Sequence, residues 1–282
     1  MRHAYPLFVL ALLLYSCTSK RSHQAYAFFI AGHVYGSPTD TLPGLHPPFR
    51  ADWDYLRSIP QLRHGVFTGD IVYHSRPEYW DSVELAVAEL ERPVYFTPGN
   101  HDQGQRSPYR ERYGRTYQKF TVEGDLFLLL DPGLGGWNIW REQLDFVRGA
   151  LAKAERYRNI FVCFHQVLWW TPEGEPASFR NQKYHPNSLD GRTPRINFWP
   201  EIVPLLVATQ RPVYLFAGDV GANQRTQALS YTRYQNLHLI ASGMGNSARD
   251  NYLIVGVDQA KKVVLAVRWL QGRRTESLLP EP

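Results

Sequence analysis

Short apolar runs along this sequence end in histidine, aspartate or asparagine, usually directly after a glycine. Five run ends share this pattern and carry His33, Asp70, Asn100, His165 and Asp219. In an α/β fold, functional groups collect where strands end and loops begin. Imidazole, carboxylate and amide oxygen together suit Mn²⁺, Zn²⁺ or Fe better than Ca²⁺, which prefers oxygen ligands alone. These residues therefore predict a site for one or two divalent transition-metal ions.

A pair of metal ions about 3.5–4 Å apart needs one carboxylate that bridges both ions. Asp70 is the natural candidate, because it lies in the central run of the set. Each residue also has an ordinary structural interpretation. Asp and Asn after glycine cap helices and form turns, and His165 could be a buried structural histidine. The ordered set as a whole favours the ligand interpretation.

The motifs resemble those of the calcineurin-like metallophosphoesterase superfamily over nearly the whole chain after residue 25. The segments GDIVY at 69–73 and GNHD at 99–102 match fully, and His165 stands at the family's single-histidine position. The resemblance implies an α/β fold, a four-layer sandwich of two mixed β-sheets flanked by helices. It also implies that His101 protonates the leaving oxygen and that Asp102 orients its imidazole.

Two motifs depart from the family pattern. The first should begin with Asp, where this chain has Ala31, and the fifth should end in His, where it has Gly221. Of the family's first metal site only His33 and Asp70 therefore remain, unless a residue such as His74 or a water completes it. The second site keeps its donors, with a carboxylate in place of one imidazole. The residues that the resemblance implies for this site are Asp70, Asn100, His165 and Asp219.

The resemblance implies a phosphoesterase in which metal-activated water attacks a phosphate mono- or diester, with His101 as general acid. A single ion can still act as a Lewis acid and acidify water, but a hydroxide bridging two cations would be lost. The alternative is a non-catalytic or single-metal binding protein on the same scaffold, acting on envelope saccharides or polymers. Metal content and hydrolysis of simple phosphate esters distinguish the two.

The elements that position these residues are short apolar strands and amphipathic helices. Helical spacing of apolar residues predicts helices around residues 80–90 and 140–151. Gly124-Asp125 is the strongest signal for a hairpin turn. The predicted strands are residues 26–31, 66–68, 94–97, 117–123, 126–131, 160–164, 213–217, 237–242, 252–257 and 263–270.

A long polar stretch over residues 170–200 lacks periodicity and predicts a loop or partial lid. Trp169 and Trp170 directly follow the predicted strand that ends at His165. We expect these indoles to bind substrate by stacking on a sugar or base ring, although packing of a helix or lid on the core would use them equally well.

The N-terminus combines a cationic start, the apolar run LFVLALLL and the segment LYSC, which ends at Cys17. This pattern is typical of a bacterial lipoprotein signal, and the alternatives are an ordinary signal peptide or a short membrane anchor. We therefore predict a lipid-anchored protein of the cell envelope, periplasmic or at the cell surface. The predicted division is a signal peptide over 1–16, lipidated Cys17 and a tether over 17–25, the metallophosphoesterase-like domain over 26–272, and a C-terminal tail over 273–282.

The composition fits one α/β domain and excludes several other classes. The chain has 282 residues, of which 44% are hydrophobic, with 31 basic and 26 acidic side chains. The basic residues are scattered, so we expect no nucleic-acid partner; the predicted partners are a phosphate ester and, through the lipid, a membrane. Two cysteines cannot build a disulfide framework, and Cys163 lies in an apolar run that predicts a buried thiol.

Overall fold

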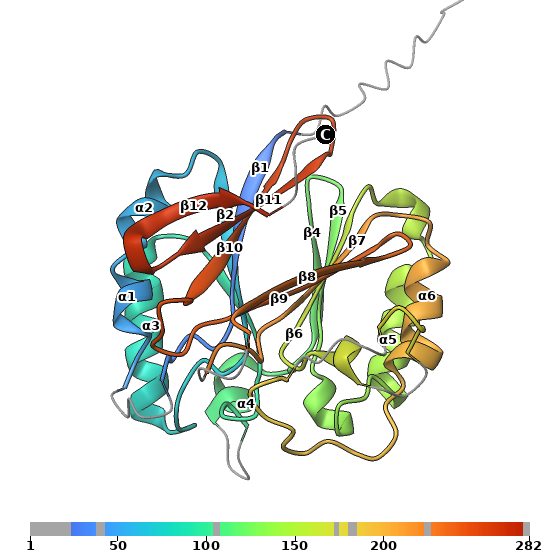
Figure 1. Ribbon diagram of the computed structural model, residues 1–282, viewed down its shortest axis with the longest axis horizontal. Coiled ribbons are helices and arrows are strands. Elements are labelled where there is room, and N and C mark those ends of the chain that lie inside the picture. Colours follow the sequence, from blue (N-terminus) through green and yellow to red (C-terminus); the bar gives the residue numbers. More distant parts are fainter. Residues whose placement is uncertain are drawn as a thin grey trace, which may run out of the picture.

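Two six-stranded sheets stacked face to face form the centre of the molecule (Figure 1). The computed structural model describes residues 24–37, 43–103, 108–171, 175–179, 185–222 and 227–278. The predicted signal peptide and Cys17 lie outside these residues. Among the residues described, no helix has both the length and the apolar character that a membrane crossing requires.

The first sheet is mixed. Its strands are β1 (Tyr26–Ala31), β2 (Leu62–Thr68), β3 (Val94–Thr97), β10 (Asn251–Val257), β11 (Val263–Trp269) and β12 (Arg274–Ser277). They lie in the order β12-β11-β10-β1-β2-β3. Strands β1, β2 and β3 run parallel to one another, whereas β10, β11 and β12 pair antiparallel with their neighbours. The parallel strands bring their carboxyl ends, and the residues after them, to one edge of the sheet.

The second sheet is also mixed. Its strands are β4 (Gln118–Val122), β5 (Asp125–Leu129), β6 (Ile160–Phe164), β7 (Val213–Ala217), β8 (Leu229–Tyr234) and β9 (Leu237–Ser242). They lie in the order β4-β5-β6-β7-β9-β8, with a parallel centre and an antiparallel strand at each edge.

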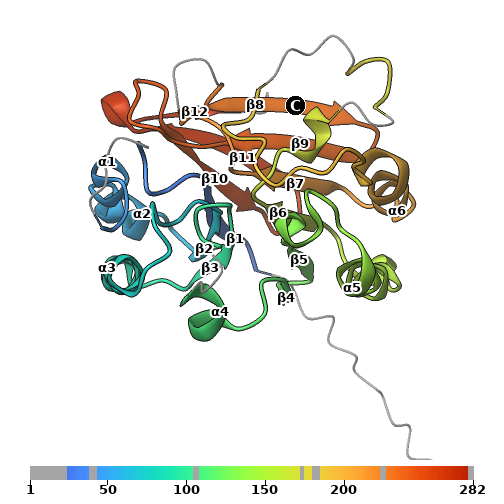
Figure 2. The same ribbon diagram turned by 90° about the horizontal axis from the view of Figure 1, so that it is seen from below.

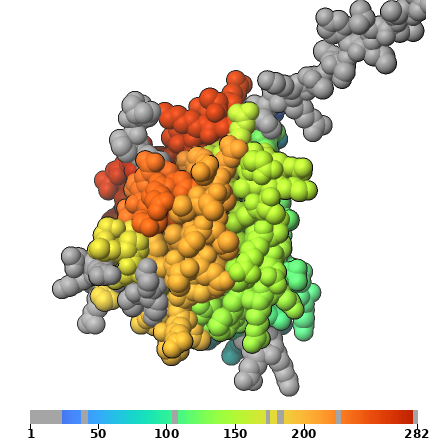
Figure 3. Space-filling model, turned by 90° about the vertical axis from the view of Figure 1, so that its right-hand side faces the viewer, coloured from blue at the N-terminus to red at the C-terminus, as the bar shows by residue number. Residues whose placement is uncertain are grey.

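Helices cover the outer face of each sheet and complete four layers (Figures 1 and 2). The first sheet carries α1 (Pro47–Arg50), α2 (Trp53–Ser58) and α3 (Pro77–Leu90), and the second carries α5 (Arg141–Leu151) and α6 (Val203–Val207). Figure 3 shows α6 in orange beside α5 in yellow-green on the outer face of the second sheet. The short helix α4 (Pro108–Tyr113) lies between β3 and β4 in the chain.

Alternation along the strands explains the layering. In β1, Phe28 and Ile30 point into the apolar core between the two sheets, whereas Phe29 and Ala31 point into the core under α1–α3. Both faces of β1 are therefore buried, which is why its sequence is a continuous apolar run rather than an alternating one. Cys163 lies in the core between the sheets, where burial raises the pKa of its thiol.

Five strands, β1, β3, β6, β7 and β9, have the bounds that the sequence predicts. The predicted hairpin is displaced by one residue, because Val122 pairs with Asp125 and the turn consists of Glu123 and Gly124. Both turn residues have positive φ, 48° and 86°, as a two-residue hairpin of this hand requires. Gly124 supplies this conformation without strain, so the glycine itself was the informative signal.

Two edge strands were not predicted. Strand β8 is a half-buried edge with polar residues on its outer side, so its sequence lacks an apolar run. Strand β12 is fully exposed and pairs with β11, so the first sheet continues into the segment predicted as a C-terminal tail. Edge strands bury little apolar area, and their sequences consequently carry a weak pattern.

Candidate metal centre

The ends of four strands meet at one point between the two sheets. Asp70 follows β2, Asn100 follows β3, His165 follows β6 and Asp219 follows β7. The strand ends pack backbone to backbone: a Cβ atom at Gly32 would lie 2.4 Å from Gly218 Cα. Only glycine permits this approach, which brings residues of both sheets within reach of a single ion.

His165 is the centre of this group. Its Nε2 lies 3.3 Å from Asp70 Oδ1, 3.2 Å from Asn100 Oδ1 and 3.7 Å from Asp219 Oδ1. Its Nδ1 donates a hydrogen bond to the Thr68 carbonyl oxygen at 3.0 Å. Because a carbonyl can only accept, this bond places the proton on Nδ1 and leaves the Nε2 lone pair directed at the three oxygens. Metal-ligating histidines are held in the same way.

Asp219 provides a test of whether these residues suit a cation. Its side chain is 1% exposed, and neither carboxylate oxygen meets hydrogen-bond geometry with a described residue. Burial, followed by the charge of Asp70, raises the pKa of Asp219 well above its usual value. The backbone N–H groups of Ser188 and Asn187 lower this pKa but do not outweigh burial. A buried carboxylate with so little compensation is costly, and a divalent ion would neutralise it. Donor chemistry and burial therefore both fit a metal ion.

Asp70 occupies the position between the two halves of the site. Burial would raise the pKa of Asp70, but the nearby histidines His165, His33 and His101 outweigh burial and lower it. Its Oδ1 also accepts the backbone N–H of His101 at 3.1 Å. The residue has a φ of +51°, an uncommon conformation for a residue other than glycine. Asp70 is thus held as an ionised carboxylate.

The other half of the site has fewer donors. His33 Nε2 lies 3.6 Å from Asp70 Oδ2. The methyl group of Ala31 belongs to the apolar core under α1–α3. Gly221 has a φ of +89°, and a Cβ there would lie 3.0 Å from the carbonyl carbon and oxygen of Gly243. His74, considered as a substitute donor, packs its ring beside Tyr73, at 4.4 Å between centroids.

His101 lies beside the cluster with its imidazole fixed from both sides. Its Nδ1 donates to the Tyr73 carbonyl oxygen at 2.9 Å, and Nε2 lies 3.4 Å from the Tyr35 hydroxyl. The prediction that Asp102 orients this ring is corrected by the structure, because the carboxylate accepts three backbone N–H groups instead. These donors are Gly99 at 2.7 Å, Ile71 at 2.8 Å and Val72 at 3.1 Å.

Asp102 therefore acts on the loops after β2 and β3 rather than on the imidazole. It is fully buried, and burial raises its pKa to about 7 against the three amide hydrogen bonds, which lower it. By tying residues 71 and 72 to residue 99, it fixes the backbone that carries Asp70 and Asn100. Asp102 is a positioning residue in this structure.

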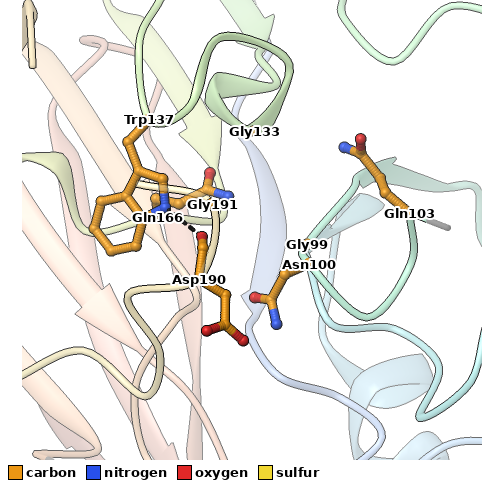
Figure 4. Close-up of a pocket in the computed structure, with 8 residues that line it drawn as sticks. All are labelled: Gly99, Asn100, Gln103, Gly133, Trp137, Gln166, Asp190 and Gly191. Atoms are coloured by element: carbon orange, nitrogen blue, oxygen red, sulfur yellow. Dashed lines mark hydrogen bonds between the residues drawn. The ribbon is translucent and has the colours of Figure 1, made fainter. Parts of the chain in front are cut away.

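Trp169 and Trp170 do not line the cavity beside the centre. Trp169 is 1% exposed and packs on Phe164 and Phe198 in the core under α5 and α6, against which Trp170 also packs. The cavity has a volume of about 200 Å³, and the tryptophan that lines it is Trp137 (Figure 4). Its lining residues are Gly99, Asn100, Gln103, Gly133, Trp137, Gln166, Asp190 and Gly191.

Sequence reasoning missed three polar residues of this cavity. Gln103 directly follows the GNHD segment and Gln166 directly follows His165, so adjacency to the motifs was a usable signal. Asp190 lies in the long polar stretch and carries no such signal. The structure places it there through Trp137, whose Nε1 donates to the Asp190 carbonyl oxygen at 3.0 Å.

Comparisons with known proteins identify the family and the fold. The family model for calcineurin-like phosphoesterases matches residues 39–243. Purple acid phosphatase PPD1 from yellow lupin (Lupinus luteus) is 11% identical with a TM-score of 0.61, over 90% of this chain and 53% of the lupin chain. This chain thus spans about half the length of that enzyme. Phosphopantetheinyl hydrolase from Mycobacterium tuberculosis is 11% identical with a TM-score of 0.41, over 92% and 98% of the two chains.

The structural similarity to the lupin enzyme, at this identity, shows a shared fold. A search of curated proteins found no match. The family model covers more than half of the chain, and the buried cluster of Asp70, His165 and Asp219 is able to hold a metal ion. This protein belongs to the calcineurin-like phosphoesterase family.

Proposed function

We propose that this protein is a metal-dependent phosphoesterase of the bacterial cell envelope that hydrolyses a phosphate monoester or diester. The observation that carries the proposal is the convergence of Asp70, Asn100 and Asp219 on His165 Nε2, with His101 beside them, in a chain of this family. Structural ion pairs alone do not explain the group, because burial holds the pKa of Asp219 well above its usual value despite the backbone N–H groups of Ser188 and Asn187.

The four donors would hold one divalent transition-metal ion, with His33 as the nearest additional imidazole. When bound, the ion supplies Lewis-acid polarisation of a phosphoryl oxygen and acidifies water. Asp70 stays ionised through its histidine neighbours, so its charge is available at neutral pH. Asp219 adds a second carboxylate, and two anions partly neutralise a divalent cation and weaken it as an acid.

His101 is the residue placed to donate a proton to the leaving oxygen. The Tyr73 carbonyl occupies Nδ1, so Nε2 is the nitrogen available for transfer. The Tyr35 hydroxyl lies 3.4 Å from the same nitrogen and restrains the ring plane. General acids of this kind contribute about 10²–10⁴ to the rate.

Metal analysis together with ester hydrolysis tests the proposal. We expect about one transition-metal ion per chain, because Ala31 and Gly221 remove two donors from the second position. We also expect Mn²⁺-dependent hydrolysis of p-nitrophenyl phosphate or bis-p-nitrophenyl phosphate. A purified chain that binds no transition metal and hydrolyses neither ester with Mn²⁺ present would instead be a binding protein on this scaffold.

A further inference from the structure

The candidate metal centre offers more oxygen donors than nitrogen donors. We propose that these oxygens, with Asp219 as the deciding one, shift the metal preference of the centre away from Zn²⁺ and toward the harder ion Mn²⁺. The inference rests on the proposed function for the presence of a metal ion. It goes further by assigning the ion that the donor set favours and the side chain that sets this preference.

The count of donor atoms is the first observation. Among the described residues, the His, Cys, Asp and Glu side chains whose ligand atoms all lie within 4.8 Å of one another are Asp70, His165 and Asp219. Asn100 adds an amide oxygen 3.2 Å from His165 Nε2. His33 does not belong to the group, and its Nε2 lies 3.6 Å from Asp70 Oδ2, the oxygen that does not face His165. The donor set is therefore three oxygens and one nitrogen.

Oxygen and nitrogen donors favour different ions. Carboxylate and amide oxygens suit Mn²⁺ and Mg²⁺, whereas imidazole suits Zn²⁺. Zn²⁺ binds a given site more tightly than Mn²⁺ as a rule, but oxygen in place of imidazole reduces that advantage. Mg²⁺ takes oxygen ligands, so the remaining imidazole of His165 disfavours it. Mn²⁺ is the hard ion that fits all four donors.

Asp219 is held beside the single imidazole by the main chain as well as by burial. The backbone N–H groups of Gly218 and Asp219 both donate to the His165 carbonyl oxygen at 3.0 Å. The Asp219 side chain is 1% exposed, and its Oδ1 lies 3.7 Å from His165 Nε2. Two donors of unlike chemistry are thus fixed relative to each other, and the carboxylate contributes an oxygen at a position where an imidazole would contribute a nitrogen.

The charge of Asp219 and its donor atom have separable effects. Mn²⁺ and Zn²⁺ carry the same charge, so loss of the carboxylate charge should weaken the binding of both ions to a similar extent. A change of the donor atom from oxygen to nitrogen should instead alter the ratio of the two affinities. Asp219→Asn removes the charge and keeps an oxygen donor, whereas Asp219→His supplies an imidazole.

Competitive metal binding by the full chain tests the assignment. The measured quantity is the ratio of the Mn²⁺ Kd to the Zn²⁺ Kd, from competition with a chromophoric chelator at constant pH. Asp219→His should raise this ratio about tenfold or more, whereas Asp219→Asn should weaken both ions and keep the ratio within about threefold of the wild type. Asp145→Asn, on the exposed face of α5, is the control and should change neither Kd. An unchanged ratio in folded Asp219→His would overturn the proposal.

A second variant decides the question if Asp219→His does not fold, since residue 219 is buried. Asn100 is half-buried and lines the cavity of about 200 Å³, so an imidazole has room there (Figure 4). Asn100→His should raise the same ratio about tenfold or more, because it also exchanges an oxygen donor for a nitrogen. Urea unfolding checks the fold of each variant. A folded Asn100→His chain with the wild-type ratio would reject the proposal.

The binding ratio and ester hydrolysis report on different claims. The expected change of ratio without hydrolysis of any ester would reject the proposed activity and support the metal assignment. Mn²⁺-dependent hydrolysis with the same ratio in wild type and Asp219→His would reject the assignment and leave the activity in place. A wild-type chain that binds neither ion would overturn both.

Discussion

The Nδ1 of His165 donates to the main-chain carbonyl of Thr68 at 3.0 Å, so the last residue of β2 sets the tautomer of a histidine at the end of β6. Each sheet thus supplies one side of the same contact. The consequence is that Nε2, which faces three oxygens, is the nitrogen left to bind an ion. Such outer contacts keep a ligand in place and are typically worth 10–100-fold in metal affinity.

Replacement of His165 tests the centre of the cluster. We expect His165→Ala to lower Mn²⁺ affinity by at least about 100-fold, because it removes the nitrogen on which the other donors converge. Titration calorimetry and metal content after dialysis measure this loss. His185→Ala removes an exposed histidine and is the matched control. Equal Mn²⁺ affinity in both variants would show that the ion binds elsewhere.

Asp219→Asn should have opposite effects with and without metal. The metal-free variant should be more stable by about 1–3 kcal/mol, because a neutral group replaces a buried carboxylate that nearby backbone N–H groups compensate only in part. The additional stabilisation by Mn²⁺, about 2.7 kcal/mol at 100 times Kd in the wild type, should shrink. Urea unfolding in EDTA and in Mn²⁺ provides both values. Asp145→Asn, on the exposed face of α5, should change neither.

His101→Gln should reduce turnover about 10²–10⁴-fold and leave bound metal unchanged, because only the backbone N–H of this residue contacts Asp70. The reduction should be smaller for p-nitrophenyl esters than for alkyl esters, since p-nitrophenolate leaves without needing a proton. Steady-state kinetics on both ester types, with metal analysis of each preparation, decide the point. Loss of metal in this variant would contradict the role as general acid.

Acid should destabilise the fold partly through His64. Burial lowers its pKa from 6.5 to about 4, and the ring packs against Phe28 and Phe127 between the sheets. Below pH 6.5 the unfolded chain takes up a proton that the folded chain excludes until about pH 4. Stability therefore falls as the pH drops through this window, by about 2–3 kcal/mol at pH 4.5 from this residue.

The variant His64→Phe isolates that contribution. Its free energy of unfolding in urea should fall less between pH 7 and pH 4.5 than that of the wild type, by the same 2–3 kcal/mol. His33 and His238 also have lowered pKa values and remain in both proteins, so their share cancels in the difference. Parallel pH profiles of the two proteins would assign the acid sensitivity to other groups.

The proposed envelope location depends on Cys17. The Cys17→Ser chain, expressed in a bacterium, should lose lipid labelling and leave the membrane fraction, because a lipid chain is the anchor that this prediction invokes. Fractionation and labelling with a fatty-acid analogue measure both properties. Equal membrane association of the two chains would indicate a different anchor. Cys163→Ser is the control thiol, although its burial requires a check of folding.

Sequence reasoning was most successful where burial and chemistry coincide. Strands with both faces buried, such as β1 and β6, have continuous apolar sequences, and their polar ends stand out against them. Because of this contrast, the sequence indicated Asp70, His165 and Asp219 as candidate ligands, and the structure brings these three together. Edge strands β8 and β12 lack that contrast and were not predicted.

Side-chain direction was the part that the sequence left open. Asp102 is adjacent to His101 in the chain, but its carboxylate turns to the backbone N–H groups of Gly99, Ile71 and Val72. Trp169 is near His165 in the chain but faces the core, whereas Trp137 reaches the cavity from the loop after β5. Neighbours in sequence need not share a direction, and only the tertiary packing determines which of them meet.

The backbone at Gly221 bears on how this centre could change over evolutionary time. A histidine there would need both a residue with φ of +89° and displacement of the Gly243 main chain. Aspartate in place of Ala31 would put a charge where a methyl group now fills an apolar core. Each single substitution is therefore penalised before the other can compensate. Any stepwise change toward a two-ion centre would therefore begin with a substitution that destabilises the fold.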